Sequence, residues 1–296
     1  MPELTDQKAM PRARSLYGCI LRNMGRRMFL AQQECPHPRF SEMEMDYIRQ
    51  VTGRLPAIRG LDFMHDDYDG VTERALRWND RGGIVTICWH TGVEGFGYPD
   101  SKQENPDFTL LLTPGTREND LLRHRWDRAA RALSRLQDAG VPVLWRPFHE
   151  FDGQWFWWGK AGGEAFRTLW REMYRAFTED YALHNLIWVL GYADYVRPGW
   201  YPGGDVCDVL GSDTYHGVTT HAVAWPLLRA LSPDKPLAFH ECGRLPSPEA
   251  FFREGAPWAW VMPWHTRWLT ENNPPEKIRE IYLHERMITL DQVSRF

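Results

Sequence analysis

The sequence predicts an α/β fold, a single-domain (β/α)8 TIM barrel, and two observations support this prediction. Short apolar runs recur eight times along the chain, with segments of helical pattern between them. The runs are continuous rather than alternating, which is typical of parallel strands covered by helices. Eightfold strand–helix alternation indicates a closed barrel. A doubly wound open sheet usually has a glycine-rich phosphate turn after its first strand, and this chain has none there.

Each expected element follows from its local pattern. The expected strands cover residues 27–33, 57–63, 83–90, 141–149, 185–192, 207–215, 236–241 and 258–264. The expected helices cover residues 121–139, 163–181, 222–231, 247–253 and 275–284. The first of these helices has apolar residues at helical spacing and ends at Gly140, a residue that commonly terminates helices.

Length and pattern together predict one domain. A (β/α)8 barrel takes about 250 residues, and the chain has 296. The sequence shows no linker, low-complexity stretch or tandem repeat. We therefore expect an N-terminal extension at residues 1–26, packed on the barrel, and the barrel itself at residues 27–296.

Charge and hydropathy narrow the range of partners. The net charge is −4, from 35 basic and 39 acidic residues, without a long run of one sign. A nucleic-acid or anionic-membrane surface needs a basic patch, so we expect neither partner. No run approaches about 18 apolar residues, and the first eight residues have no apolar signal core. The localisation stays open: secreted if a signal peptide was removed, cytoplasmic if Met1 is the native start. We expect a monomer.

The five cysteines are expected to be buried free thiols, because their number is odd, two fall within expected strands and Cys242 directly follows a third. A Cys19–Cys35 bridge is the alternative. No Cys-x-x-Cys spacing suggests a metal site.

The 15 tryptophans are a second unusual feature. We expect about half to fill the core and others to present ring faces, on which the apolar C–H faces of sugars stack.

Two glutamates on separate apolar runs are the strongest functional signal. Glu150 follows the run 141–149, and Glu241 ends the run 236–241. The carboxyl ends of barrel strands are where such barrels carry their active sites. Two carboxyl groups near a tryptophan cluster suggest glycosidic bond hydrolysis, which needs a proton donor and a second carboxylate. The expected strand ends also gather these polar and aromatic residues: Asp62, His65, Trp89, His90, His149, Trp155, Asp213, Tyr215, His240, Trp264 and His265.

The segment 145–159, Trp-Arg-Pro-Phe-His-Glu-Phe-Asp-Gly-Gln-Trp-Phe-Trp-Trp-Gly, resembles the acid–base motif of glycoside hydrolase family 26, the β-mannanase family. That family has histidine before the acid–base glutamate, and His149 fits. Further similar segments lie at residues 60–63, 82–90, 211–215, 239–243, 260–265 and 287–291. The resemblance covers nearly the whole chain from about Met28 onward.

The resemblance implies a role for each matching residue. Glu150 corresponds to the acid–base and Glu241 to the nucleophile. The residues implied to line the subsites around the scissile bond are His90, His149, Trp155, Tyr215 and Trp264. Two segments depart from the pattern: Cys242-Gly-Arg follows the nucleophile, and the loop 91–99 indicates no particular substrate.

A retaining mechanism needs Glu241 ionised and Glu150 first protonated, with the two carboxyl groups about 5–5.5 Å apart. Closely placed like charges raise the pKa of one partner. Tyr215 is placed to hydrogen-bond the nucleophile. Arg146 lies four residues before Glu150, so strand alternation places the two side chains on the same face. Arg146 is either a cation that keeps Glu241 ionised or a member of an inward ion pair of the barrel. No step requires a metal or organic cofactor.

The leading hypothesis is an endo-acting β-1,4-mannanase that cleaves mannan, galactomannan or glucomannan. Within the same family, the resemblance also allows an exo-mannobiohydrolase, a β-1,3-1,4-glucanase or a β-1,3-xylanase. From a different class, the alternative is a catalytically inactive carbohydrate-binding barrel. Such proteins usually lose one of the two carboxylates, whereas Glu150 and Glu241 are both present.

Overall fold

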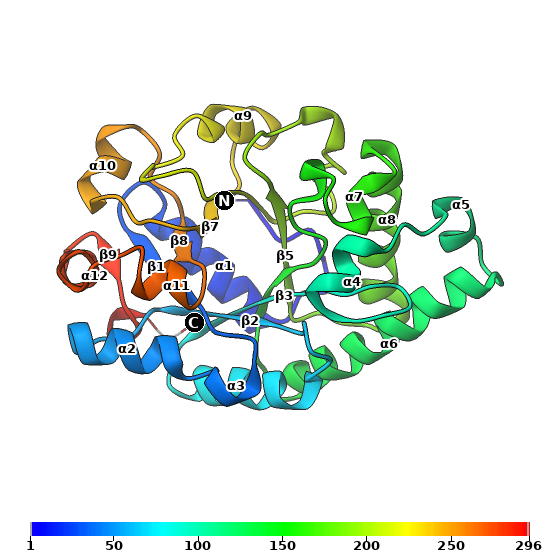
Figure 1. Ribbon diagram of the computed structural model, residues 1–296, viewed down its shortest axis with the longest axis horizontal. Coiled ribbons are helices and arrows are strands. Elements are labelled where there is room, and N and C mark those ends of the chain that lie inside the picture. Colours follow the sequence, from blue (N-terminus) through cyan, green and yellow to red (C-terminus); the bar gives the residue numbers. More distant parts are fainter. Residues whose placement is uncertain (1, 295) are drawn as a thin grey trace.

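The computed structural model describes residues 2–294 and 296, which fold into a closed parallel barrel surrounded by helices (Figure 1). The strands are β1 (Met28–Gln33), β2 (Ile58–Asp62), β3 (Ile84–Cys88), β4 (Val143–Arg146), β5 (Leu186–Tyr192), β6 (Val209–Thr214), β7 (Leu237–Cys242) and β8 (Trp260–Pro263). Each strand pairs in parallel with the next, and β8 pairs with β1, which closes the barrel. The predicted (β/α)8 fold is therefore confirmed. A short ninth strand, β9 (Met287–Ile288), pairs with β1 from outside the barrel.

All eight predicted strands are present, but β4 is shorter than predicted. The expected strand reaches residue 149, whereas β4 ends at Arg146. Phe148 and Glu150 have φ angles of 50° and 53°, in the left-handed region that a strand cannot contain. Glu150 therefore lies on a turn after the strand. The strand alternation invoked for Arg146 and Glu150 does not extend through this turn.

The helices surround the strands as the alternating pattern predicts. They are α1 (Pro11–Asn23), α2 (Met43–Thr52), α3 (Tyr68–Asp80), α4 (Gly97–Gln103), α5 (Phe108–Leu111), α6 (Arg117–Asp138), α7 (Trp157–Lys160), α8 (Gly163–Arg175), α9 (Ala224–Leu231), α10 (Pro248–Arg253), α11 (Arg267–Thr270) and α12 (Pro275–Tyr282). The helix expected at 163–181 is α8 followed by a π-helical turn, η3 (Ala176–Asp180). The bounds of α2 and α3 were not predicted, because their buried faces include Glu44, Thr72 and Arg74 and so lack a purely apolar stripe.

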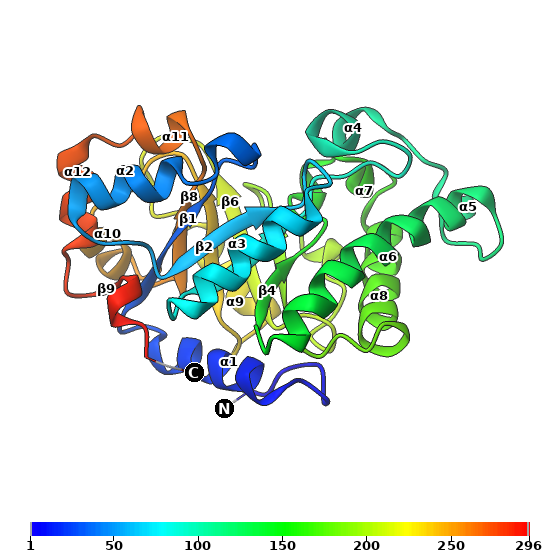
Figure 2. The same cartoon turned by 90° about the horizontal axis from the view of Figure 1, so that it is seen from below.

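Helix α1 covers the amino-terminal end of the barrel, opposite α4, α7 and α11 (Figure 2). Its Leu16 and Ile20 belong to the same buried cluster as Phe29 and Ile58 of β1 and β2. Tyr17 also donates a 3.1 Å hydrogen bond to the Asp208 carbonyl before β6. This packing closes one end of the barrel and leaves the other end for a site. The division of the chain at residues 26 and 27 stays a prediction.

The cysteine prediction is confirmed, because all five cysteines are free and buried and the Cys19–Cys35 alternative is not realised. We expected about half of the tryptophans to fill the core, and the number is higher: ten of the 15 are less than 2% exposed.

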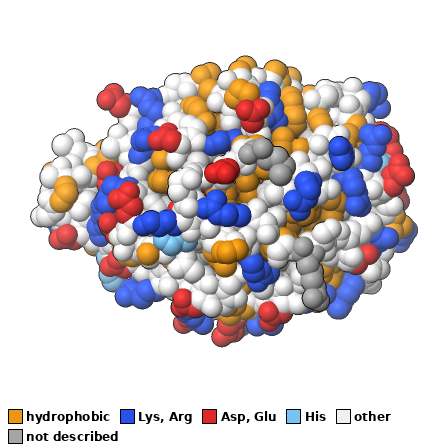
Figure 3. Space-filling model, turned by 180° about the vertical axis from the view of Figure 1, so that it is seen from behind, with side chains coloured by type: hydrophobic (Ala, Val, Ile, Leu, Met, Phe, Trp, Pro, Cys, Tyr) orange, Lys and Arg blue, Asp and Glu red, His pale blue; other side chains and the backbone are white. Residues whose placement is uncertain are grey.

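On the face away from the view of Figure 1, basic and acidic side chains are interspersed (Figure 3). Among the described residues, no helix is both long and apolar enough to cross a membrane.

Gly191 in β5 leaves room for the Arg146 side chain inside the barrel. A Cβ atom at Gly191 would lie 2.7 Å from Arg146 Nε. We predict that Gly191→Ala lowers the free energy of unfolding by about 1–3 kcal/mol, the usual cost of overpacking, measured by denaturant titration. Gly199→Ala is the control, because a Cβ there meets nothing within 4 Å. Equal stabilities of the two variants would contradict the prediction.

Candidate active site

One cleft at the carboxyl ends of the strands, with a volume of about 510 Å³, holds every site residue that the sequence predicted. The seven predicted residues, all of which line this cleft, are His90, His149, Glu150, Trp155, Tyr215, Glu241 and Trp264. They come from the ends of β3, β4, β6, β7 and β8 and from the turns that follow. The barrel therefore brings together residues that lie up to 174 positions apart, from His90 to Trp264.

Three carboxyl groups meet at the centre of this cleft. One oxygen from each of Glu150, Asp213 and Glu241 lies within 4.8 Å of the other two. All three residues are at most 9% exposed. This close approach favours the roughly 5–5.5 Å carboxyl separation of retaining glycosidases over the roughly 6.5–9.5 Å of inverting ones.

The fully buried Arg146 guanidinium connects two of these carboxyl groups. Its Nη1 atom donates a 2.6 Å hydrogen bond to Glu241 Oε1, and its Nη2 atom donates to Asp213 Oδ2. The second Glu241 oxygen accepts a 2.7 Å hydrogen bond from the Tyr215 hydroxyl. Arg146 was expected either to form an inward ion pair or to contact Glu241, and it does both: it points into the barrel and pairs with Asp213 and Glu241.

Tyr215 stays a hydrogen-bond donor to Glu241. Burial raises the pKa of Tyr215 well above its usual value, and the Glu241 charge raises it further. A tyrosine in this state keeps its proton over the whole range in which enzymes operate. With Arg146 on one oxygen and Tyr215 on the other, the Glu241 carboxylate is fixed in orientation.

Glu150 is in a different environment from Glu241. Burial raises the pKa of Glu150 to about 7, and the nearby Glu241 charge contributes further. The Arg146 charge and a hydrogen bond from Trp155 oppose this increase. That hydrogen bond runs from Trp155 Nε1 to Glu150 Oε2 over 2.9 Å. A carboxyl group with this pKa can give up a proton and take it back near neutral pH.

Hydrogen bonds to main-chain carbonyl groups hold the turn that presents Glu150. The Glu150 N–H donates to the Gly191 carbonyl over 2.7 Å. Trp158 Nε1 donates to the His149 carbonyl, and Trp157 Nε1 donates to the Thr91 carbonyl. Both of these tryptophans are fully buried, whereas Trp155 is 38% exposed. The tryptophan run therefore divides by role, with two members anchoring the turn and one facing the cleft.

Two histidines and Trp264 form another part of the cleft wall. The Nε2 atoms of His90 and His149 lie 3.1 Å apart, and His149 Nε2 lies 3.9 Å from Glu241 Oε1. Burial lowers the pKa of His149 well below its usual value, and the Arg146 charge lowers it further. Trp264 follows β8 directly, and its ring centre lies 6.1 Å from that of His90, edge to face.

Several cleft residues were not in the predicted site. Asp213 was recognised at a strand end but received no role. Tyr98, Lys102, Phe156, Asp194, Arg267 and Trp268 also line the cleft. Trp268 lies four residues after Trp264, and this helical spacing in a tryptophan-bearing segment was an available signal. His65 and His240, also expected at strand ends, do not line this cleft.

Two groups of side chains among the described residues have the composition of a metal site. The first is Glu150, Asp213 and Glu241, whose charge Arg146 already balances in part. The second is Asp62, Cys88 and His90, in which Asp62 Oδ2 and His90 Nδ1 are hydrogen-bonded to each other. The arrangement of the first group suits proton transfer and nucleophilic attack, because one carboxyl group has a raised pKa and another is held by two donors.

Fold and site together define a class: (β/α)8 barrels with a pair of facing acidic side chains in an aromatic-lined cleft at the carboxyl ends of their strands. The particular family follows from comparison with known proteins. The chain belongs to glycosyl hydrolase family 26, whose family model matches residues 5–292.

Named relatives and solved structures agree with this family. A mannan endo-1,4-beta-mannosidase from Thermothelomyces thermophilus is 31% identical over 98% of this chain and 63% of its own length. A β-(1,4)-mannanase structure from Podospora anserina has a TM-score of 0.90 and 31% identity, over 99% of this chain and 69% of that one. A β-mannanase structure from a symbiotic protist of the termite Reticulitermes speratus, complexed with gluco-manno-oligosaccharide, has a TM-score of 0.88 and 28% identity. The match covers 99% of this chain and 98% of that one.

The chain is shorter than the curated relatives it matches. It spans 63% of the Thermothelomyces protein and 54% of a mannan endo-1,4-beta-mannosidase B from Piromyces. The matched region in both relatives corresponds to at least 98% of this chain. The likeness therefore concerns the barrel and its cleft.

The geometry predicts a large energetic role for Arg146. We predict that Arg146→Ala lowers the free energy of unfolding at pH 7 by about 3–5 kcal/mol, because two buried carboxyl groups lose their cation. The loss should shrink toward pH 4, since burial raises the pKa of Asp213 and protonation removes its unpaired charge. Denaturant titrations at both pH values measure this difference.

Arg171→Ala is the matched control, because Arg171 pairs with Asp205 on the surface. Exposed pairs contribute about 0–1 kcal/mol, so this variant should be nearly as stable as the parent. Similar losses for Arg146→Ala and Arg171→Ala at pH 7 would contradict the role assigned to the buried cation.

Proposed function

We propose that this chain is a retaining glycoside hydrolase that cleaves internal β-1,4-mannosidic bonds in mannan, galactomannan or glucomannan. The observation that supports it most is the close approach of Glu150 and Glu241 in the cleft of a family 26 barrel. The names of the relatives supply the substrate class, since the matched curated proteins are called mannan endo-1,4-beta-mannosidases.

In the first step, Glu241 is the nucleophile. Its carboxylate oxygen attacks the anomeric carbon, and the glycosidic C–O bond breaks to leave a covalent glycosyl-enzyme. Arg146 and Tyr215 orient the carboxylate by their hydrogen bonds to its two oxygens.

Glu150 is the acid–base in both steps. Its proton passes to the leaving glycosidic oxygen in the first step, which lets the sugar depart as an alcohol. In the second step the ionised Glu150 takes a proton from water as the water oxygen attacks the anomeric carbon. Formation of the glycosyl-enzyme also removes one cause of the raised pKa of Glu150, because Glu241 becomes a neutral ester.

The aromatic residues give the cleft its sugar-binding surfaces. We assign Trp264 to the platform beneath the sugar at the cleavage site, beside His90 and His149. Trp155 belongs to the leaving-group side, because its Nε1 atom bonds the proton donor. Aromatic stacking contributes about 0.5–1.5 kcal/mol beyond burial of area.

A reducing-sugar assay across several glycans tests the proposed substrate. We expect release of reducing ends from mannan, galactomannan and glucomannan, with a rapid drop in viscosity because internal bonds are cut. Activity confined to lichenan or β-1,3-xylan would mean that the substrate is another β-glycan, cleaved by the same mechanism. Binding without turnover on every glycan would overturn the assignment as an enzyme.

Replacing each glutamate separates the two catalytic roles. We predict that Glu241→Ala abolishes turnover and leaves oligosaccharide binding nearly intact, as measured by calorimetry. Glu150→Ala should lose less activity on an aryl β-mannoside than on polymer, because a good leaving group needs little protonation. An equal loss on both substrates would assign Glu150 a structural role instead.

The pH dependence follows from the Glu150 environment. The free enzyme needs Glu150 protonated, so kcat/KM should fall above about pH 7, the pKa of this group. Trp155 donates to Glu150 and lowers its pKa, so Trp155→Phe should move the alkaline limb to higher pH. Trp268→Phe, in the same cleft but without this bond, should leave the limb in place. A limb that moves to lower pH in Trp155→Phe would refute the assignment.

A further inference from the structure

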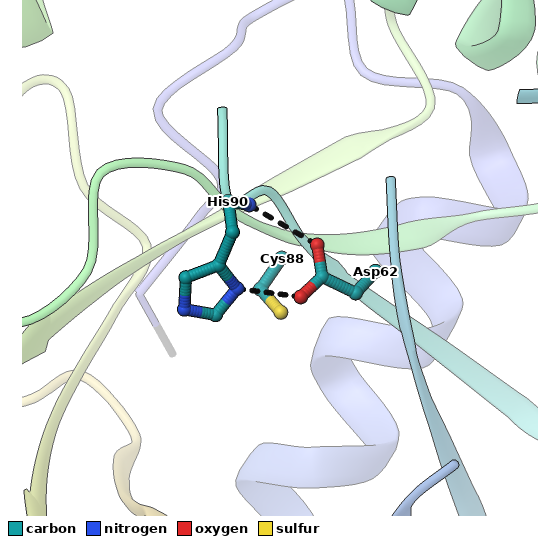
Figure 4. Close-up of side chains that lie close together, drawn as sticks. All are labelled: Asp62, Cys88 and His90. Atoms are coloured by element: carbon teal, nitrogen blue, oxygen red, sulfur yellow. Dashed lines mark hydrogen bonds and ion pairs between the residues drawn. The ribbon is translucent and has the colours of Figure 1, made fainter. Parts of the chain in front are cut away.

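The Asp62 carboxylate at the end of β2 uses both of its oxygens to hold one residue, His90, by its backbone and by its imidazole ring (Figure 4). Asp62 Oδ1 accepts a 3.1 Å hydrogen bond from the His90 backbone N–H. Asp62 Oδ2 lies 2.6 Å from His90 Nδ1. Both residues are at most 3% exposed, so water does not compete for these contacts. Asp62 itself does not line the cleft, whereas His90 does.

This contact fixes the position of one proton on His90. An ionised carboxylate only accepts hydrogen bonds, so the Nδ1 atom facing Asp62 must carry a proton. Burial acts to raise the pKa of Asp62, but His90 outweighs that effect and the pKa is lowered, which keeps the carboxylate ionised. In the neutral imidazole, Nε2 is then an acceptor.

The fixed tautomer determines how His90 meets His149. The two Nε2 atoms are 3.1 Å apart, so a hydrogen bond between them needs a proton on one of them. With the neutral His90 accepting at Nε2, His149 must donate from its own Nε2. That assignment leaves His149 Nδ1 as a bare lone pair, which agrees with the absence of a hydrogen-bond partner for this atom among the described residues.

We propose that Asp62 is a positioning residue for the cleavage reaction: it fixes the tautomer and orientation of His90, so that His90 and His149 share a single proton beside Glu241. This inference rests on the proposed function. The chain Asp62–His90–His149 ends 3.9 Å from the Glu241 carboxylate and thus connects the nucleophile to a carboxylate outside the cleft. Asp62 acts only through His90.

The charges around the two histidines favour His90, rather than His149, as the residue that takes up an additional proton. Burial acts to lower the pKa of His90, but Asp62 outweighs it and the pKa is raised. Burial and Arg146 lower the pKa of His149 well below its usual value. An extra proton on the pair therefore resides on His90. The titratable groups that face His90 are Asp62, Cys88, Tyr98, His149, Glu150, Glu241 and His265.

Nitrogen-15 NMR of histidine-labelled protein tests the tautomer without relying on activity. In the parent protein, Nδ1 of His90 should stay protonated at every pH, and only Nε2 should titrate. A neutral His90 with its proton on Nε2 would overturn the proposal. Because this readout needs no substrate, it stands even if the protein shows no activity on any glycan, which separates it from failure of the proposed function.

Asp62→Asn tests the consequence for catalysis. The amide can donate to Nδ1, so the variant should populate the Nε2–H tautomer that the carboxylate forbids. We expect kcat to fall between about 10-fold and about 10⁴-fold, the range found when a carboxylate partner of a working histidine is lost. KM should change less than threefold, and His90 should titrate at lower pH. Unchanged kcat with a shifted tautomer would overturn the proposal.

Cys88→Ala is the matched control for burial. Cys88 lies in the same group of side chains and is 2% exposed, but it makes neither hydrogen bond to His90. This variant should keep the tautomer and kcat of the parent. If Cys88→Ala lost kcat as Asp62→Asn does, the effect would belong to packing, and the positioning role would be rejected. If Asp62→Asn does not fold, the NMR measurement on the parent decides.

Discussion

The site depends on one buried cation that lies among three carboxyl groups and bonds two of them. Arg146 is fully buried and bonds Glu241 and Asp213 directly, while Glu150 lies within 4.8 Å of both acids. Full ionisation of all three would leave two uncompensated negative charges inside the protein, which is strongly unfavourable. Glu150 makes no hydrogen bond to the guanidinium, and its pKa is raised to about 7. The different roles of the two glutamates follow from which of them Arg146 holds.

The backbone is arranged around this charge balance. Gly191 has no side chain, so Arg146 can lie against β5, and the same glycine's carbonyl accepts the Glu150 N–H. The turn that carries Glu150 has two non-glycine residues, Phe148 and Glu150, with positive φ. Left-handed conformations cost roughly 1–2 kcal/mol per residue. Buried tryptophans on the following segment hold the turn by hydrogen bonds to main-chain carbonyls, which offsets that cost.

Much of this arrangement could be predicted from the sequence, and the remainder depends on packing across the barrel. The apolar runs predicted the strands, and the strand ends placed Glu241 and Tyr215 in one cleft. The exit of the chain from β4 depends on φ angles at Phe148 and Glu150 that no local pattern indicates. The contact of Asp62 with His90 joins two strands through side chains, and only the register of β2 against β3 sets it. Helices α2 and α3 escaped prediction because charged side chains interrupt their buried stripes.

The central claim is that Glu150 and Glu241 act by double displacement, and the anomeric form of the first product tests it most directly. Proton NMR during hydrolysis of a β-1,4-manno-oligosaccharide distinguishes the anomers before they interconvert. Two successive inversions at the anomeric carbon return the original configuration, so the account predicts that the β-anomer appears first. Initial release of the α-anomer would show a single displacement by water, and it would contradict the nucleophilic role that the Arg146 and Tyr215 contacts give to Glu241.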